Sequence, residues 1–323
     1  MGEAGVSADD EQLHVRVAWL YHMEDMTQGA IAERLGLTRL RVNRILAECR
    51  ARGLVQVSIR SKLQGCVALE RRLTARFGLR DAVIVPTPDD GDKTAEFIGL
   101  AAGEFLTRHL ARETVDNFGI GWGGTLREAI RGMEPASRPD LHVVSMMGGL
   151  TQGLDLNTFE IAGELARRMQ AQCSYLVAPL YAGSAASRDL IMAQDVFAAT
   201  FARMQAIDLA LLSLGDLTPR SLLVRHGLPS DIGIAEIGRA GAVGDIMGRF
   251  LDARGRPIDH PINARAVAMP LDGLARIACV VVAAGGLNKA AVIAAALQGG
   301  FADVLVSDER SAEAALALIP DHA

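Results

Sequence analysis

Hydrophobic and polar positions change their spacing once along the chain, near residue 80. Before this point apolar residues recur every three or four positions, which is the period of amphipathic helices. After it, short apolar runs alternate with stretches of helical spacing, as in repeated βα units. The runs predict strands at residues 175–178, 209–214 and 277–283, among others, and the helical stretches predict helices at residues 158–169 and 190–204. Runs that are apolar throughout are typical of strands buried on both faces of a parallel sheet. The pattern predicts a helical N-terminal domain and a larger α/β domain.

Three short helices are expected in the N-terminal domain. The first covers residues 14–21. Thr27 is a suitable N-cap for a second helix over residues 28–35, and Thr38 for a third helix, with Gly36 in the turn between them. This succession is typical of a helix-turn-helix.

The third predicted helix leaves cationic side chains on its outer faces, because Val42, Ile45 and Leu46 form its apolar stripe. Arginine binds guanine edges or phosphates, and asparagine binds adenine edges. The alternative is a solvated cationic face. Alternating residues 54–60 predict a strand or wing. The candidate DNA contacts are Gln28, Thr38, Arg39, Arg41, Asn43, Arg44 and, on the wing, Arg60.

Charge is segregated in a way that favours DNA binding. The whole chain has a net charge of −5, but residues 39–60 hold six arginines and one glutamate. That window is therefore +5 and the remainder is −10. A basic segment joined to an acidic body is what a modular DNA-binding protein needs.

Several classes of protein are disfavoured by composition. No apolar run reaches the length of a membrane span, and residues 1–12 are acidic and polar, which predicts a short disordered lead instead of a secretory signal. The four cysteines are far apart, so no metal or redox motif is expected. We expect a cytoplasmic protein without a cofactor.

Residues 115–130 have the pattern of a strand, a glycine loop and a helix. Gly121, Gly123 and Gly124 allow positive φ angles and close approach of a ligand to the backbone. A helix opening at Thr125 would direct unpaired N–H groups and its positive dipole end at the loop. The loop suits an anion such as phosphate. The alternative is that these glycines only form a tight turn.

The same loop fits a dinucleotide fingerprint less well. Gly119, Gly121 and Gly124 fall at the G-x-G-x-x-G positions, but the next predicted strand, residues 141–147, is followed by no carboxylate before Asp155. A dinucleotide-binding fold places an acidic residue there to hold the ribose. A sugar phosphate therefore fits better than NAD.

Other candidate ligand contacts follow strands further along the chain, where open α/β sheets bind ligands. Gly148 and Gly149 follow the strand at 141–147, and Lys289 follows a glycine pair at a helix start. Lys289 could neutralise a phosphate or could be solvent-exposed. Asp245 could accept hydrogen bonds from sugar hydroxyls or could tie down a turn.

These motifs, in this order, resemble the SorC (sorbitol-operon) family of bacterial transcriptional regulators. Residues 28–46 are similar to the DNA-binding head of the family. The body is similar at residues 119–125, 147–149, 178–179, 244–246 and 285–286, together with Lys289. Family members often carry an acidic residue where this chain has Leu287, so the ligand need not have the group that such a carboxylate would bind.

The fold expected from the pattern and the resemblance is a winged helix-turn-helix over residues 13–61, a linker helix over 62–80 and an effector domain over 81–323. The resemblance implies that the effector domain is Rossmann-like, similar to sugar-phosphate isomerases and deaminases. It also implies a homo-oligomer, a dimer or tetramer, whose affinity for operator DNA is changed by a small sugar phosphate or polyol. Residues 149–152 and 157–160, with residues 178–181, look closest to the erythritol-pathway branch, which favours a small polyol or its phosphate over a hexose bisphosphate. Gln152 is a further candidate effector contact.

Two further functions would be compatible with parts of the pattern. An isomerase or deaminase-type enzyme with an accessory DNA-binding head would need a catalytic acid/base pair, and Asp245 has few convincing partners in the sequence. A constitutive DNA-bound scaffold would show no stabilisation by ligands. A transcriptional regulator without enzymatic activity is the leading hypothesis.

Overall fold

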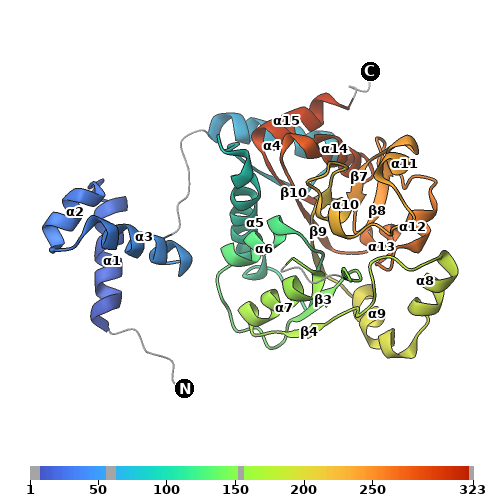
Figure 1. Ribbon diagram of the computed structural model, residues 1–323, viewed down its shortest axis with the longest axis horizontal. Helices are drawn as coiled ribbons and strands as arrows, with labels where there is room; N and C mark the ends of the chain where they lie inside the picture. The colour runs from blue at the N-terminus through green and yellow to red at the C-terminus, as the bar shows by residue number, and fades with distance from the viewer. Residues whose placement is uncertain (1–7, 56–62, 152–155, 320–323) are drawn as a thin grey trace. The chain divides into compact units, whose positions relative to one another are not determined.

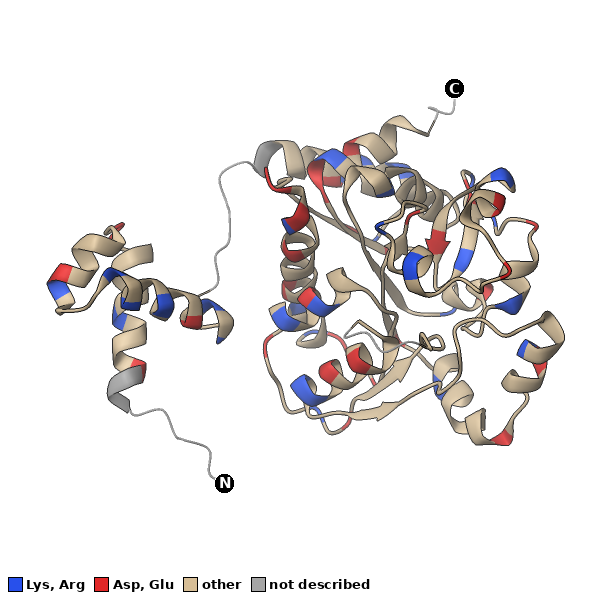
Figure 2. Cartoon of the chain, in the orientation of Figure 1, with Lys and Arg blue, Asp and Glu red and all other residues tan. Residues whose placement is uncertain are grey.

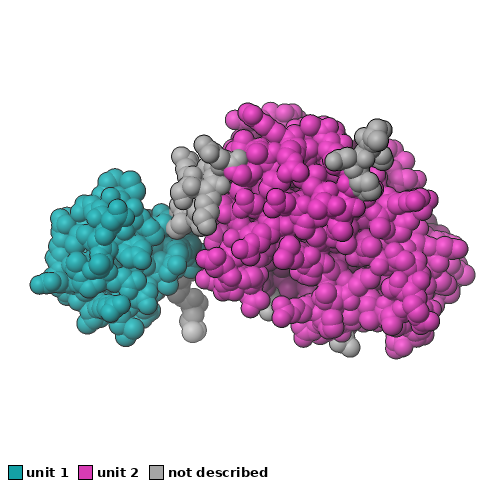
Figure 3. Space-filling view, turned by 90° about the horizontal axis from the view of Figure 1, so that it is seen from above, with its two compact units in different colours: residues 1–61 teal, residues 62–323 magenta. Residues whose placement is uncertain are grey.

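The computed structural model describes residues 8–55, 63–151 and 156–319. The chain divides into two compact units, residues 1–61 and residues 62–323 (Figure 3). The smaller unit is called the DNA-binding unit after the predicted helix-turn-helix, and the larger one the effector unit after the predicted effector domain. Each has a hydrophobic core.

The DNA-binding unit is a bundle of three helices, α1 (Ala8–His22), α2 (Gln28–Leu35) and α3 (Arg39–Ala51). As predicted, the hydroxyls of Thr27 and Thr38 cap α2 and α3 by accepting hydrogen bonds from backbone N–H groups. The core includes Val17, Ile31 and Val42, which are fully buried.

Helix α1 begins at Ala8, inside the segment predicted to be a disordered lead. This segment looked unstructured because it is acidic and polar, but most helical stability comes from the packing of an apolar face, and Val17 and Leu20 bury that face of α1. Most of the predicted wing, including Arg60, lies outside the described residues.

Helix α4 (Leu63–Phe77) covers most of the segment expected to be a linker. Cys66, Leu69 and Leu73 are buried in the main core of the effector unit. The helix therefore belongs to that unit and is not a free connection.

The effector unit is built on a seven-stranded sheet in which all pairs are parallel (Figure 1). Its order is β1-β10-β9-β5-β2-β3-β4. The strands are β1 (Asp81–Val85), β2 (Asn117–Ile120), β3 (His142–Ser145), β4 (Gln172–Ser174), β5 (Leu209–Leu212), β9 (Cys279–Ala283) and β10 (Val304–Asp308). The parallel sheet predicted from the apolar runs is confirmed.

Both faces of this sheet are buried, which explains why its strands are apolar throughout. In β9, Cys279 and Val281 contribute to one core, whereas Val280 and Val282 contribute to the other. The first core is closed by α5 (Thr94–Leu110), α6 (Gly124–Gly132) and α7 (Thr158–Met169). The second is closed by α4, α9 (Ala198–Gln205), α14 (Ala290–Gln298) and α15 (Glu309–Ala317).

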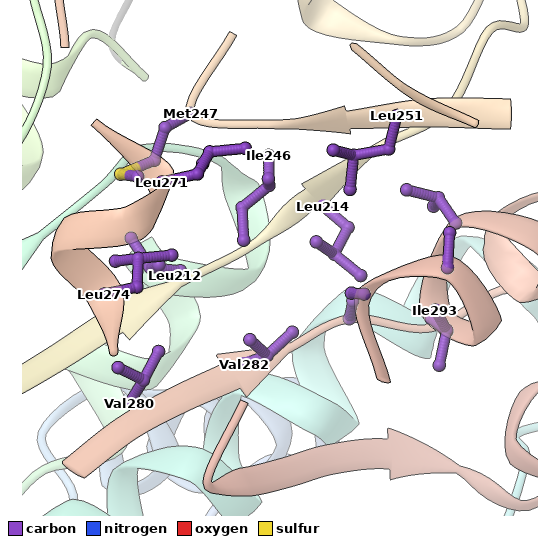
Figure 4. Packing of buried hydrophobic residues seen from close by; sticks show 14 of the residues in the cluster. Leu212, Leu214, Ile246, Met247, Leu251, Leu271, Leu274, Val280, Val282 and Ile293 are labelled. Carbon is purple, nitrogen blue, oxygen red and sulfur yellow. The ribbon is translucent and has the colours of Figure 1, made fainter. Parts of the chain in front are cut away.

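A second, antiparallel sheet was not predicted. It consists of β6 (Leu214–Gly215), β7 (Ala242–Ile246) and β8 (Arg249–Asp252). Leu214, Ile246 and Leu251 pack in one cluster with Val282 of the main sheet (Figure 4). The small sheet is thereby fixed beside the carboxyl ends of the central strands.

Two predicted elements are displaced in the structure. The strand expected at residues 175–178 is instead β4, which ends at Ser174. The single helix expected at 190–204 is broken into α8 (Ala185–Met192), the 3-10 turn η2 (Asp195–Phe197) and α9.

The remaining elements are short. They are η1 (Gly91–Lys93), α10 (Leu222–His226), α11 (Ile234–Arg239), α12 (Pro261–Arg265), α13 (Leu271–Leu274) and η3 (Leu287–Lys289). Across the described residues, no helix has the length and apolar character needed to cross a membrane.

Candidate functional site

A pocket of about 220 Å³ lies beyond the carboxyl ends of β2, β5 and β9. This is where open parallel sheets bind ligands. Gly123, Gly124, Thr125, Asp245 and Lys289, which the sequence indicated separately, line it together. The other described lining residues are Trp122, Ser213, Leu214, Gly215, Asp216, Arg220, Ser221, Leu222, Leu223 and Asn288.

One wall of the pocket is the N-terminus of α6. Gly123 caps this helix with φ 129° and ψ 161°, a backbone conformation that side-chain-bearing residues rarely adopt. The first N–H groups of a helix have no intrahelical partner, and no side chain caps α6, so those of Gly124 and Thr125 remain available. A Cβ added at Gly124 would meet no atom within 4 Å. The wall thus offers free donors and space, as an anion site requires.

Charged side chains form another part of the lining. The Asp216 carboxylate accepts hydrogen bonds from the Asn288 amide and from the backbone N–H of Thr218, both at 2.7 Å. Asp245 accepts a hydrogen bond from the N–H of Gly248 through Oδ2 at 3.0 Å. Its Oδ1 is buried without a hydrogen-bond partner among the described atoms. This oxygen has almost no accessible surface, so a ligand hydroxyl would reach it only after a small movement of the side chain.

Burial governs the protonation of this group of residues. It raises the pKa of Asp245 to about 6, against the opposing effects of the Gly248 N–H and the Lys289 ammonium. Burial also lowers the pKa of Lys289, while the carboxylates of Asp216 and Asp245 favour its charged form. Titratable groups perturbed in this way are concentrated at functional sites.

Asp245 is held in place by a tight turn. The turn joins β7 to β8 through Met247 and Gly248, with φ angles of 50° and 74°. Two consecutive positive φ angles are the signature of a type I′ hairpin turn. Tyr181 donates its phenolic proton to the carbonyl of Gly248. The turn thus links the pocket carboxylate to the segment that leads into α8.

Three predicted effector contacts lie elsewhere. Gly121 is buried after β2, where its N–H bonds the Leu211 carbonyl. Gly148 and Gly149 do not appear in the pocket lining. A Cβ at Gly148 would lie 2.6 Å from the carbonyl oxygen of Ala178, so this glycine is required for close packing.

Gln152 lies outside the described residues. Conversely, the sequence did not single out Asp216, Asn288 or Arg220 as effector contacts. Two features of the sequence could have pointed to them. Asp216 follows a glycine at a strand end, and Asn288 directly precedes the predicted contact Lys289.

The candidate DNA-binding face lies on α3. Arg39, Arg41, Asn43 and Arg44 are exposed, and Figure 2 shows the basic positions along this helix. Thr38 acts as the N-cap, accepting a hydrogen bond from the N–H of Arg41 at 3.2 Å. Gln28 is partly buried at the start of α2.

Arg44 is oriented by a carboxylate on the same helix. Its Nε donates to Glu48 at 2.9 Å, and the other carboxylate oxygen of Glu48 lies 2.8 Å from His14 Nε2. Hydrogen bonds from His14 and Arg44 lower the pKa of Glu48. The recognition helix is therefore tied to α1 at the base of its basic face.

Comparison with known proteins covers both units. A family model of sugar-binding domains matches residues 61–317, and a MarR family model matches residues 17–62. The erythritol catabolism regulatory protein EryD of Brucella abortus is 30% identical over 305 residues, which are 94% of this chain and 96% of that protein. The transcriptional regulator LsrR of Enterobacter sp. strain 638 is 33% identical over 98% of this chain and 96% of its own length.

Solved structures agree with this assignment. The full-length sorbitol operon regulator SorC from Klebsiella pneumoniae superposes with a TM-score of 0.69 at 25% identity, covering 97% of this chain and all of that one. A DeoR family transcriptional regulator from Listeria monocytogenes gives a TM-score of 0.70 at 27% identity, over 78% of this chain and 100% of its own.

These relatives are named as regulators, which argues against the alternative of an enzyme with a DNA-binding head. Together with the pocket and the basic recognition helix, they make DNA and a sugar effector the partners of this chain. The chain belongs to the SorC family of transcriptional regulators, which join a DNA-binding head to a sugar-binding domain.

Proposed function

We propose that this protein controls a carbohydrate or polyol catabolic operon and that its effector is a small sugar or polyol carrying a phosphate. The protein acts in the cytoplasm as a homo-oligomer, a dimer or tetramer. Effector binding shifts it between states that differ in affinity for operator DNA, because only a ligand with different affinities for two states can change their balance.

The observation that carries this proposal is the convergence of two chemistries in one pocket. The N-terminus of α6, with Gly123, Gly124 and Thr125, offers N–H donors to an anion. Elsewhere in the same lining, Asp245 holds a buried carboxylate oxygen that lacks a partner among the described atoms. A ligand with a phosphate at one end and hydroxyls at the other matches both.

Lys289 and Arg220 complete the charge balance of the lining. Together with Asp216 and Asp245 they make the described charged groups of the pocket formally neutral. Lys289 is already shared between two carboxylates. Binding of a phosphate would therefore depend on the α6 N-terminus and Arg220 as well as on Lys289.

The size of the pocket favours a short ligand. A volume of about 220 Å³ lies below the usual range of drug-sized sites, roughly 300–1,000 Å³. The name of the Brucella relative refers to erythritol catabolism, which is consistent with a small polyol or its phosphate. A hexose bisphosphate is correspondingly disfavoured.

The two tryptophans allow the proposal to be tested. Trp122 lines the pocket and Trp19 lies on α1, so a Trp19→Phe chain reports ligand binding through Trp122 alone. This chain would be titrated with erythritol, erythritol 4-phosphate, sorbitol 6-phosphate and inorganic phosphate, and thermal unfolding would be followed at fixed protein concentration. A ligand at 100 times its Kd adds roughly 2.7 kcal/mol.

The panel separates the parts of the proposal. Binding of a phosphorylated compound in preference to the free polyol is the expected result. Equal binding of erythritol and its phosphate would refute the phosphate end, and no response to any compound would favour a DNA-bound scaffold. Operator DNA selected from a random duplex library then shows whether the bound compound releases the protein or promotes binding.

A further inference from the structure

Helix α1 carries apolar side chains on two opposite faces. Its inner face includes Val17 and Leu20, which are buried in the core of the DNA-binding unit. Trp19 lies about 160° around the helix from Val17 and is 56% exposed. A helix that is apolar on both sides is normally covered on both sides. The outer face therefore points to a partner.

The outer face is a continuous ridge. Val15, Trp19 and Met23 are spaced by four residues, so their side chains are neighbours along one side of the helix. Met23 N–H donates to the carbonyl of Trp19 at 2.8 Å, which carries the helical geometry to the end of the ridge. Val15 is 50% exposed and Met23 is 65% exposed. We name these three residues the α1 ridge.

We propose that the α1 ridge packs against the α1 ridge of a second copy of this chain. The ridge is symmetric about its middle residue, since apolar side chains lie four positions before and after Trp19. An antiparallel pair with the two tryptophans at the centre would place Val15 of each copy toward the partner's Met23. Ridges of residues four apart interdigitate in the commonest class of helix packing, at an angle of about −50°.

The size of the ridge favours a second copy over an unrelated protein. A tryptophan buries about 150–250 Å², so three partly exposed side chains offer a few hundred Å² at most, whereas a stable interface needs about 800 Å² from each partner. Such a contact forms only when its partner is already close. The proposed homo-oligomer, on which this inference rests, supplies a second copy at an effective concentration in the millimolar range.

The location of the ridge is compatible with DNA binding. The inner face of α1 packs on α2 and α3, so the ridge points away from the recognition helix. Pairing two units through α1 would leave Arg39, Arg41 and Arg44 accessible on both copies. Helix-turn-helix dimers read two half-sites related by symmetry. The α1 contact would thus set the spacing of the two recognition helices.

Disulfide trapping in the full chain tests the contact directly. Trp19→Cys places a thiol at the centre of the ridge, and Glu33→Cys places one at an exposed position on α2 as the matched control. The native Cys49, Cys66 and Cys279 are buried and Cys173 is partly buried, so the unmodified chain gives the background. We expect mild oxidation to convert Trp19→Cys, and not Glu33→Cys, to a covalent dimer on a non-reducing gel.

Two additional measurements decide the meaning of a negative result. Sedimentation gives the mass of the chain, and the emission of a Trp122→Phe chain reports whether Trp19 is covered. An oligomeric chain without trapped dimer would overturn the α1 contact alone. In that case, blue-shifted emission means that Trp19 is covered within its own chain, and solvent-like emission means that it is free. A chain that is monomeric by mass and gives no trapped dimer would overturn the proposed homo-oligomer as well.

Discussion

Replacing Asp245 with asparagine should stabilise the effector unit at neutral pH while weakening effector binding. Asp245 is 4% exposed and has one carboxylate oxygen without a partner among the described atoms. Its pKa is raised from 3.8 to about 6, chiefly by burial. At 1.36 kcal/mol for each pH unit, keeping this group ionised costs the folded state roughly 3 kcal/mol.

The sign follows from the direction of the change. The folded state holds the proton of Asp245 more tightly than the unfolded state, so this residue destabilises the fold as pH rises from about 4 to about 6. The resulting cost is about 3 kcal/mol at pH 8 and roughly half of that at pH 5. Asp245→Asn should therefore exceed the wild type in free energy of unfolding at pH 8, and the difference should fall by about half at pH 5.

Urea unfolding followed through Trp122 measures this difference in a Trp19→Phe background at fixed protein concentration. Asp89→Asn is the matched control, because Asp89 is exposed and the same chemical change should have little effect there. The same Asp245 variant should bind a hydroxyl-bearing effector roughly ten- to a hundredfold more weakly, because a hydrogen bond to a charged group contributes about 1.5–3 kcal/mol. A variant less stable than wild type at pH 8, or a difference independent of pH, would refute the reasoning.

Three further substitutions test other parts of the molecule. Gly124→Val should abolish the effector response measured by ligand titration, because the valine side chain would fill the pocket. Operator binding and stability should be unchanged, since a Cβ at this position meets no atom within 4 Å. An equal loss of DNA binding would contradict two separate sites. Arg44→Ala should weaken operator binding by about 1–3 kcal/mol if it contacts a base, and unchanged affinity in a gel-shift titration would make its face a solvated one. Tyr181→Phe removes the donor to Gly248 and should lower stability by about 1 kcal/mol. It should also reduce the change in operator affinity that saturating effector causes. An unreduced change would show that Tyr181 takes no part in the coupling between effector binding and DNA binding.

The sequence was most informative where periodicity and local chemistry agree. Helix α2 (Gln28–Leu35) and helix α7 (Thr158–Met169) have the predicted ends, because N-cap side chains mark where each begins. Strands β5 and β9 are buried on both sides, so their unbroken apolar runs were sufficient to identify them as strands. In the pocket, Gly123, Gly124 and Lys289 were identifiable because glycines and a cation follow strand ends.

Features formed by residues distant in sequence could not be predicted. The two-residue strand β6 exists only because it pairs with β7, and no periodicity can be read from so short a segment. Gly148 resembled a ligand-binding glycine, but the carbonyl of Ala178 requires its lack of a side chain. Asp216 is a pocket residue because Asn288 is folded against it from 72 positions away. Sequence spacing does not encode such contacts.

The position of Asp245 suggests how the pocket could influence the rest of the oligomer. One oxygen of its carboxylate fixes the N–H of Gly248, and the carbonyl of the same glycine accepts the proton of Tyr181. The other oxygen is buried and has no partner among the described atoms, so a small movement of the side chain would let a ligand hydroxyl bond it without displacing a protein donor. Any shift of the carboxylate toward that ligand would change its bond to Gly248. The turn at Met247 and Gly248 is well suited to respond, because positive φ at Met247 is unfavourable and is maintained by these hydrogen bonds. The effector would thus act on a strained turn that Tyr181 connects to the segment leading into α8, and we expect a change in this turn to be the first step of the response to the ligand.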